Sequence, residues 1–412
     1  MNTGPMNTGE VRSEVSRWIT EHWDPGMPLE RWRMLLADSG WGCPTWPERW
    51  CGRGLSGALG RVVAEEMRRA VVPGPPEGLG MMLVAPVILE HGSEELKERY
   101  IRPTVTGEIT WCQLFSEPGA GSDLAGLQSR AERDGDAWRL SGQKVWSTGA
   151  ATADFGLLLA RTDWDVSKHQ GITAFVLPMR QPGVTVRPLR QMNGHSSFNE
   201  VFFDEAHVEE VIGELGGGWA VARATLAHER RLAVFPPLPS DVTGRAWQEA
   251  IAERTAIAEP HKWYPQRAGR PDLVISLAQA LGRSRDPVVR QEIAKLIELS
   301  WSARWMAERA AAAKAAGERP GPEGSLGKLA SSKIAKQAAR VHSMIAGPAG
   351  LLSGPGSLLS GTITEISVSV PAISIAGGTD EIQRSIIAER ILGLPREPDV
   401  SVGIPFRDVR TG

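Results

Sequence analysis

Three short segments of this chain combine small residues with hydroxyl or aromatic side chains, a composition suited to holding a flat, polar ligand. The first runs from Phe115 to Asp123 and reads FSEPGAGSD. Glycines let a backbone approach a ligand closely, and the hydroxyls of Ser116 and Ser122 can donate hydrogen bonds to polar ring atoms or to a phosphate. A glycine-rich turn between two domains has the same composition, so this segment alone leaves both interpretations open.

The second segment, residues 141–149, reads SGQKVWSTG. An aromatic side chain followed by a hydroxyl, here Trp146 and Thr148, suits stacking on a flat heteroaromatic ring and hydrogen bonding to it. The alternative is a hairpin whose tryptophan belongs to the hydrophobic core.

The third segment, residues 375–384, reads IAGGTDEIQR. Gly377 and Gly378 precede a threonine and an acid, which predicts a loop that enters a helix with Thr379 as its N-cap. The amino end of a helix favours anionic groups. A capped helix without any ligand is the simpler alternative.

The elements that must position these segments fall into three regions. Residues 1–110 carry apolar residues at helical spacing, as in Glu10–His22. Residues 111–212 show strand-length apolar runs separated by turn residues, which predict an antiparallel β domain. Helical periodicity returns over residues 213–412, with a proline-rich interruption near 235–282. We therefore expect an α+β multi-domain protein whose domains are these three regions.

The clearest helices and strands can be placed by residue number. The predicted helices are Glu10–His22, Ser56–Arg69, Gly78–His91, Ala220–Val234, Pro287–Ala316 and Leu326–Ile345. The predicted strands are Ala137–Leu140, Phe155–Ala160, Thr173–Leu177, Val184–Val186 and Val201–Phe203.

Composition excludes several classes of function. The net charge is −2, which argues against a nucleic-acid partner. The chain has no apolar run of about 18 residues, so we expect no membrane insertion. Three cysteines are too few for a disulfide framework, and the N-terminus lacks the apolar stretch of a signal peptide. These features predict a cytoplasmic protein.

Taken together, in this order and at this separation, the three segments resemble the signatures of the acyl-CoA dehydrogenase family. Those signatures are a TEPGAGSD-like segment, a G-Q-K-x-W-x-T segment and a Y-E-G-T-x-x-I-Q-R-like segment. The run Ile386–Arg396 also resembles the family's C-terminal helix, so the similarity covers nearly the whole chain. It implies an N-terminal helical domain, a middle β domain and a C-terminal four-helix bundle, with FAD between the last two.

The resemblance also implies roles for individual residues. Ser122 would lie at the edge between flavin and substrate, and Arg230 is a second candidate for substrate contact. The residues implied to contact or adjoin the flavin are Phe115, Ser116, Trp146, Thr148, Gly378 and Thr379.

The chemistry of such a site requires a base for the α-proton of a thioester and hydrogen-bond donors for the thioester oxygen. In the commonest family pattern the base is the glutamate of Y-E-G-T, and Gly377 stands in its place here. Glycine cannot accept a proton, but the backbone N–H of Gly377 can still polarise the thioester oxygen. Members of the isovaleryl-CoA type instead place the base in an L-x-x-E-R motif, which resembles Leu226–Arg230, LAHER.

The spacing of residues around Glu229 agrees with that placement. An ionised carboxylate on an apolar stripe is costly to bury unless it is paired or functional. We therefore predict that Glu229 is the α-proton base. The alternative is a structural ion pair of Glu229 with Arg223 or Arg230. The stripe, at helical spacing, consists of Trp219, Ala222, Leu226, Glu229 and Ala233.

The first hypothesis is therefore an FAD-dependent α,β-dehydrogenase of an acyl-CoA thioester. It would use an electron acceptor such as an electron-transfer flavoprotein, and form a homo-oligomer or a hetero-oligomer with a related chain. Residues 281–291 and 346–356 depart from the family's R-x-x-F-G and Gln-x-x-Gly-Gly motifs, and the former resembles an actinobacterial subgroup that degrades steroids and other bulky acids. Some enzymes of that subgroup are mixed assemblies. The alternatives are a non-catalytic or half-site subunit of such an assembly, and a flavin oxygenase of the same fold.

Overall fold

The computed structural model describes most of the chain. The described residues are 6–229, 239, 242–316, 321–398 and 401–409.

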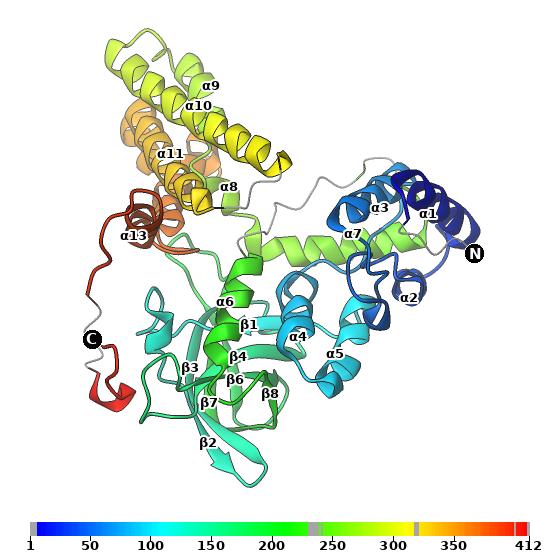
Figure 1. Cartoon of the computed structure of the whole chain (residues 1–412). Coiled ribbons are helices and arrows are strands. Elements are labelled where there is room, and N and C mark those ends of the chain that lie inside the picture. The colour runs from blue at the N-terminus through cyan, green and yellow to red at the C-terminus, as the bar shows by residue number, and fades with distance from the viewer. Residues whose placement is uncertain (1–5, 230–238, 240–241, 317–320, 399–400, 410–412) are drawn as a thin grey trace. The chain divides into compact units, whose positions relative to one another are not determined.

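The chain divides into two compact units (Figure 1). The first unit comprises Met1–Leu189, Ser197–Pro260 and Ser401–Gly412. The second comprises Arg190–Ser196 and His261–Val400.

The first unit begins with helices that are amphipathic, so each buries one face. Asn7 caps the first helix in a capping box with Glu10, and the buried side chains of that helix pack against Trp32. A short π-helix, Gly80–Val84, leads into the fourth helix, and a Cβ on Gly80 would lie 2.8 Å from the ring of Trp111. The five helices are α1 (Thr8–His22), α2 (Leu29–Ser39), α3 (Gly57–Arg69), α4 (Ala85–His91) and α5 (Glu94–Thr106).

An eight-stranded sheet follows in the same unit. Its strand order is β6-β7-β3-β2-β4-β5-β8, and β1 also pairs with β4. The strands β1 and β2 each pair with β4 in parallel, and the other pairings are antiparallel. The strands are β1 (Trp111–Leu114), β2 (Arg130–Asp134), β3 (Ala137–Thr148), β4 (Phe155–Arg161), β5 (Ile172–Pro178), β6 (Val184–Leu189), β7 (Phe198–Val208) and β8 (Glu210–Ile212).

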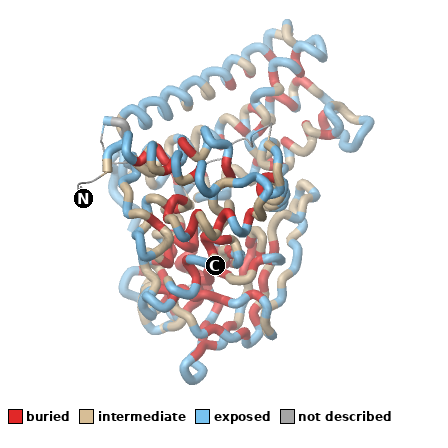
Figure 2. The backbone as a smooth tube through the Cα atoms, turned by 90° about the vertical axis from the view of Figure 1, so that its right-hand side faces the viewer, coloured by how far each residue is buried: buried red, intermediate tan, exposed pale blue. Residues whose placement is uncertain are grey.

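Two α-helices of the first unit follow the sheet. The helix α6 (Gly218–Glu229) starts directly against β5, because a Cβ on Gly218 would lie 2.6 Å from the backbone of Thr173. The helix α7 (Arg245–Ala258) packs on the N-terminal helices, where Glu253 accepts two hydrogen bonds from Arg33 at 2.6 and 2.9 Å. The buried residues of this unit form cores made by the strands and by helices such as α4 and α5. Figure 2 shows the buried residues of the chain in red.

The second unit is a helical bundle. The long helix α10 packs along α11, which also contacts α9, α12 and α13. The core between α9, α10 and α11 is aliphatic and includes Leu277, Leu296 and Val341. The helices are α8 (Tyr264–Arg267), α9 (Val274–Ala280), α10 (Pro287–Ala315), α11 (Glu323–Ala346), α12 (Thr362–Ser369) and α13 (Asp380–Arg390).

In the part of the chain that the structure describes, the predicted helices and strands are present, with differences in extent and pairing. The predicted strand Ala137–Leu140 is only the start of β3, and the sheet contains two parallel pairings as well as antiparallel ones. The proline-rich region 235–282 contains α7, α8 and α9, which are divided between the two units. The end of the predicted helix Ala220–Val234 lies outside the described residues. The domain boundaries at residues 110 and 212 stay a prediction.

Among the described residues, none of the helices combines the length and the apolar character that a membrane crossing requires.

Candidate active site

The loop after β1 is attached to the middle of β3. The backbone N–H of Val145 donates to the carbonyl of Ser116 at 2.9 Å, and Lys144 Nζ donates to the carbonyl of Phe115 at 3.0 Å. The structure therefore brings the first two predicted segments together, and with them Phe115, Ser116 and Trp146.

A buried ion pair lies beneath this junction. The distance from Lys144 Nζ to Glu117 Oε1 is 2.8 Å, and both side chains are buried. The carboxylate of Glu117 also accepts hydrogen bonds from the backbone N–H groups of Gln128, at 2.7 Å, and Ser129, at 2.9 Å. These bonds tie both ends of the loop to β3.

The electrostatics of the pair follow from its burial. Burial lowers the pKa of the Lys144 amine, and the nearby Glu117 carboxylate partly offsets that effect. Burial also raises the pKa of Glu117, but the charge of Lys144 and the hydrogen bonds outweigh it and hold that pKa below its ordinary value. A charged, fully hydrogen-bonded pair fixes the position of the loop.

Trp146 lies in a β-bulge of β3, where the register with β7 shifts between Lys144 and Ser147. Its φ is +63°, a left-handed conformation that is rare for a bulky residue. Its ring is 55% exposed and packs edge-on against Phe198, with the ring centroids 5.6 Å apart. Strained backbone and an exposed large aromatic side chain are both unfavourable in isolation, and both are typical of ligand sites.

The outer side of the loop is open and polar. A Cβ on Gly119 or Gly121 would meet no atom within 4 Å, and Ser122 is exposed. Ser116 and Thr148 are half-buried. An exposed indole, hydroxyls and open backbone in one region fit a flat heteroaromatic group such as a flavin.

Phe115 differs from the other candidates in this region. Its side chain is buried in the apolar core that also contains Leu124 and Leu157. The side chain therefore anchors the start of the loop, and its predicted contact with a flavin stays a prediction.

Glu229 is the last residue of α6 that the structure describes, and it is half-buried. It lies one helical turn after the buried Thr225, and Trp219 and Leu226 pack against the same apolar core as the buried face of α6. The neighbouring His228 contacts Glu90, with 2.9 Å between Nε2 and Oε1. The carboxylate of Glu229 thus lies at the end of a largely apolar face.

Two members of this predicted cluster cannot be placed. Arg230 and Ala233 lie outside the described residues.

The third predicted segment lies in the second unit. Gly377 and Gly378 have φ values of +69° and +86°, which glycine adopts readily. The hydroxyl of Thr379 accepts a hydrogen bond from the N–H of Ile382 at 3.2 Å, which confirms the predicted N-cap of α13. The structure therefore brings Gly377, Gly378 and Thr379 together at the start of one helix.

The carboxylate of Asp380 secures the start of α13 from the inside. It is buried and accepts hydrogen bonds from Ser332 Oγ at 2.9 Å and Lys336 Nζ at 2.8 Å. Burial raises the pKa of Asp380, but these hydrogen bonds and the two nearby lysine charges outweigh it, so its pKa lies below the ordinary value.

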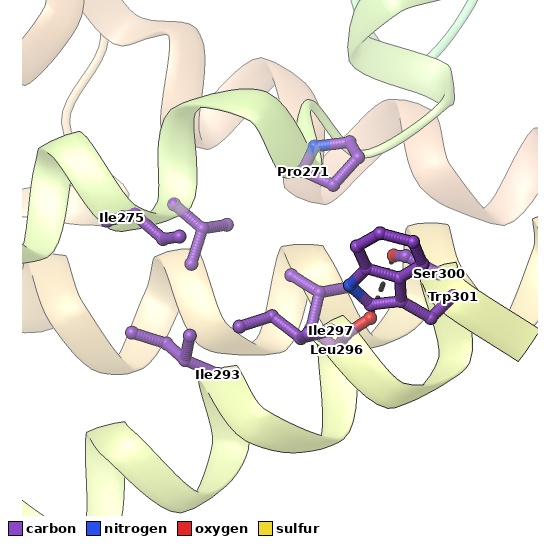
Figure 3. A pocket seen from close by; sticks show the side chains of 8 residues that line it. Pro271, Ile275, Ile293, Leu296, Ile297, Ser300 and Trp301 are labelled. Carbon is purple, nitrogen blue, oxygen red and sulfur yellow. Dashed lines mark hydrogen bonds between the residues drawn. The ribbon is translucent and has the colours of Figure 1, made fainter.

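A small apolar cavity of about 120 Å³ lies between α9 and α10 in the second unit (Figure 3). Its lining is aliphatic apart from Ser300 and Trp301, and none of the residues that line it is ionisable. Ligand pockets are usually about 300–1,000 Å³, so this cavity is too small for a CoA thioester. None of the predicted site residues lines this cavity.

Comparison with known proteins decides the family. The chain matches the family models for the acyl-CoA dehydrogenase N-terminal domain over residues 8–108, middle domain over 112–206 and C-terminal domain over 276–392. It is 37% identical to acyl-CoA dehydrogenase FadE34 of Mycobacterium tuberculosis over 94% of this chain and 49% of that protein. The chain belongs to the acyl-CoA dehydrogenase family. It thus spans about half the length of FadE34.

Other acyl-CoA dehydrogenases match over their whole length. The chain is 32% identical to acyl-CoA dehydrogenase IpdE1 of Mycolicibacterium smegmatis, over 94% of this chain and 98% of that protein. These matches confirm the predicted family, fold class and enzyme class. The family implies a flavin cofactor.

Two solved structures are similar in fold. One is described as the Tcur3481-Tcur3483 steroid ACAD, with a TM-score of 0.63, 26% identity, and coverage of 96% of this chain and 99% of that chain. The other is the ChsE4-ChsE5 complex from Mycobacterium tuberculosis, with a TM-score of 0.62, 25% identity, and coverage of 96% and 100%. Both descriptions name two different proteins.

The acyl-CoA dehydrogenase motifs contain two functional candidates that sequence reasoning passed over. Glu117 lies in the segment FSEPGAGSD and Lys144 in the segment SGQKVWSTG. Neither was predicted to have a role, because a charged side chain close to glycines is usually exposed to solvent. The available signal was Lys144 itself, a charged residue directly before Val145 and Trp146 in a strand. Its pairing with Glu117 depends on the fold.

Proposed function

We propose that this chain catalyses the FAD-dependent α,β-dehydrogenation of an acyl-CoA thioester. The observation that carries the proposal is Trp146, a strained and exposed aromatic residue on a β-bulge. The bulge is hydrogen-bonded to the loop that carries Ser116 and Ser122. Family membership supports the reaction class, and the geometry of the bulge supports the place of the cofactor.

The residues that would hold the cofactor are those the resemblance implied. Trp146 presents its indole face, and Ser116 and Thr148 present hydroxyls and backbone groups to the flavin ring. Bound FAD supplies the hydride acceptor for the β-carbon. The full set proposed for FAD is Phe115, Ser116, Ser122, Trp146, Thr148, Gly378 and Thr379.

The chain's own residues handle the proton and the thioester oxygen. Glu229 takes the α-proton, because the position of the family's commoner base is occupied by Gly377. The backbone N–H of Gly377 donates a hydrogen bond to the thioester oxygen, where negative charge develops. Ser122 and Arg230 contact the substrate. An electron-transfer flavoprotein is the proposed electron acceptor.

The substrate class is proposed from the relatives. Because a similar solved structure is described as a steroid ACAD, we propose an acyl-CoA with a steroid-derived or other bulky acyl group. An ordinary fatty acyl-CoA is the competing substrate class.

A related chain is the proposed partner, and a half-site subunit is the second candidate function. Two observations favour it: both similar structures pair two different proteins, and α10 is exposed at every residue from Trp301 to Ala312 except Ala303. Exposed aromatic residues on such a helix favour burial by a partner. The large apolar residues of α9 and α10 that are exposed are Ile275, Val288, Ile297, Trp301, Trp305 and Met306.

The test is an anaerobic absorbance experiment on the purified chain. We expect a yellow protein whose flavin absorbance bleaches when a substrate acyl-CoA is added, and faster with a bulky acyl group than with a short linear one. A chain that stays colourless after incubation with excess FAD would contradict the proposal. Recovery of flavin and activity only on co-expression with a related chain would support the half-site subunit instead.

A further inference from the structure

The C-terminal segment 401–409 packs back onto the first unit, although it follows the last helix of the second in sequence. Phe406 is 2% exposed, and its N–H donates to the carbonyl of Val166 at 2.8 Å. The next N–H, of Arg407, donates to the carbonyl of Trp164 at 3.0 Å, and the rings of Phe406 and Trp164 are 5.4 Å apart. The segment is therefore anchored by backbone bonds and by a buried ring.

The ring of Phe406 covers a buried cation. The guanidinium carbon of Arg161, the last residue of β4, lies 3.4 Å from the centroid of that ring. Arg161 is itself fully buried, and burial lowers its pKa to about 10, so it keeps its charge at neutral pH. A cation–π contact is strongest when water is excluded in this way.

The hydrogen bonds of Arg161 lead to the candidate flavin loop. Its Nη2 donates to the carbonyl of Ala125 at 2.7 Å, and its Nε donates to that of Leu127 at 3.2 Å. Ala125 belongs to the short 3-10 turn Leu124–Gly126 that ends the glycine-rich loop, and Leu127 directly follows that turn. The third group, Nη1, donates to the carbonyl of Lys168 at 3.0 Å.

A second connection reaches the same loop. Lys168 Nζ binds both carboxylate oxygens of Asp123, at 3.0 and 3.1 Å, and Asp123 directly follows Ser122. The far end of the turn is held by Glu117 through Gln128 and Ser129. The turn is thus fixed from one side by the ion pair under β3 and from the other by Arg161.

We infer that the C-terminal segment is a positioning element of the FAD site, in which Phe406 holds Arg161 and Arg161 holds the loop that carries Ser116 and Ser122. The inference rests on the proposed function. Without the ring, water reaches the guanidinium and competes for its hydrogen bonds to Ala125 and Leu127. The loop then samples other conformations, and FAD binds a less ordered site. Phe406 and Arg161 are positioning residues, and neither is proposed to contact FAD.

A small set of variants distinguishes this role from a general contribution to stability. Phe406→Ala removes the ring, and Arg407→Ala is the matched control because its side chain pairs with Asp165 at the surface. We expect FAD affinity of the apoprotein, measured by quenching of flavin fluorescence, to fall about tenfold in Phe406→Ala, the size expected for a desolvated cation–π contact. Arg407→Ala should bind FAD like the wild type, and Phe406→Tyr should restore most of the affinity.

Hydrogen exchange of the apoprotein provides a readout that needs no cofactor. Amides of residues 122–129 should exchange faster in Phe406→Ala than in the wild type. They should also exchange faster in Phe406→Leu, which fills more of the space left by the ring than alanine does but cannot make the cation–π contact. In Arg407→Ala they should exchange at the wild-type rate. Unchanged FAD affinity and unchanged exchange in Phe406→Ala and in Phe406→Leu would overturn the inference alone, even if the melting temperatures of these variants fall. A wild-type chain that binds no FAD would overturn the proposed function and this inference together.

Discussion

The two candidate cofactor segments, one in each unit, are supported in different ways. The loop before Ser122 rests on Glu117 and the fully buried Lys144, whereas the start of α13 rests on Asp380 and on Lys336, whose side chain is 52% exposed. Both segments place glycines with open space on their outer side, at Gly119, Gly121 and Gly377. The carboxylate of Glu117 is therefore buried together with its lysine, whereas the buried carboxylate of Asp380 pairs with a lysine that is half exposed to solvent.

The difference shows what each segment must do. A helix N-cap is built from local chemistry, since the hydroxyl of Thr379 and the N–H of Ile382 lie within one turn. The loop and β3 must instead hold the ring of Trp146, which sits on a strained part of the β3 backbone, beside hydroxyls of the loop. That arrangement requires bonds between residues distant in sequence, and a buried ion pair contributes geometry more than stability.

The largest expected effect concerns the base, which the proposal places on α6 of the first unit and not at Gly377 of the second. Glu229→Gln should leave the fold and the flavin content unchanged and lower turnover by about 10³-fold, because a general base is lost. Stopped-flow bleaching of the flavin with a substrate acyl-CoA measures this effect.

The control on the same helix is Arg223→Ala. Arg223 is exposed, and it is one of the two residues considered as a structural ion-pair partner of Glu229. The Arg223→Ala variant should retain nearly full activity. Equal losses in the two variants would assign Glu229 to a structural ion pair, and activity of Glu229→Gln within tenfold of the wild type would remove it as the base.

The next effect compares the two lysines. Lys144→Met leaves the Glu117 carboxylate buried without its cation, so the free energy of unfolding should fall by about 3–5 kcal/mol. Lys336→Met should cost less than about 1 kcal/mol, because Lys336 is half exposed and Asp380 keeps its hydrogen bond from Ser332. Urea denaturation followed by circular dichroism gives both values. Similar losses of unfolding free energy in the two variants would show that the Glu117–Lys144 and Asp380–Lys336 pairs contribute equally to stability.

A smaller effect tests the strain at Trp146. Replacement by alanine loses the contact with Phe198 and keeps the left-handed backbone, whereas replacement by glycine loses the contact and relieves the strain. Trp146→Gly should therefore be more stable than Trp146→Ala by about 1 kcal/mol. A glycine variant that is no more stable than the alanine variant would mean that the bulge is unstrained.

The smallest effect concerns pH. The pKa values of Glu117 and Asp380 both lie below their ordinary values in the folded protein, so each contributes stability that is fully present above the ordinary carboxyl pKa and is lost as pH falls through the folded pKa. Stability should thus decline below about pH 4, since ordinary carboxyl pKa values are about 4. The decline should be shallower in Asp380→Asn and in Glu117→Gln. Equal slopes in wild type and variants would contradict the assignment.

The sequence predicted features that depend on local pattern. The amphipathic α1, the long α10 and α11, and the cap at Thr379 follow from spacing and residue type over a few turns. The three motifs also identified which segments meet the cofactor in the proposal. Local pattern and motif resemblance were sufficient for the fold class and the family.

Features that depend on distant contacts could not be predicted in the same way. The bulge at Trp146 arises from pairing with β7, the docking of α7 arises from ion pairs such as Arg33–Glu253, and the burial of Arg161 arises from Phe406 near the other end of the chain. The sequence shows Arg161 at the end of an apolar run, but the residues that contact it are determined by tertiary packing. The same holds for the parallel pairing of β1 with β4.

The most direct test of the central claim is FAD titration of apoprotein carrying Trp146→Gly or Thr148→Ala. Stacking of an aromatic side chain on a heteroaromatic ring contributes about 1–3 kcal/mol, so we expect Trp146→Gly to bind FAD at least about fivefold more weakly. Thr148→Ala should show a smaller loss, and both variants should keep the wild-type circular dichroism spectrum. If both bind FAD with wild-type affinity and an unchanged visible spectrum, the flavin does not lie against the bulge of β3, and the proposed site is wrong.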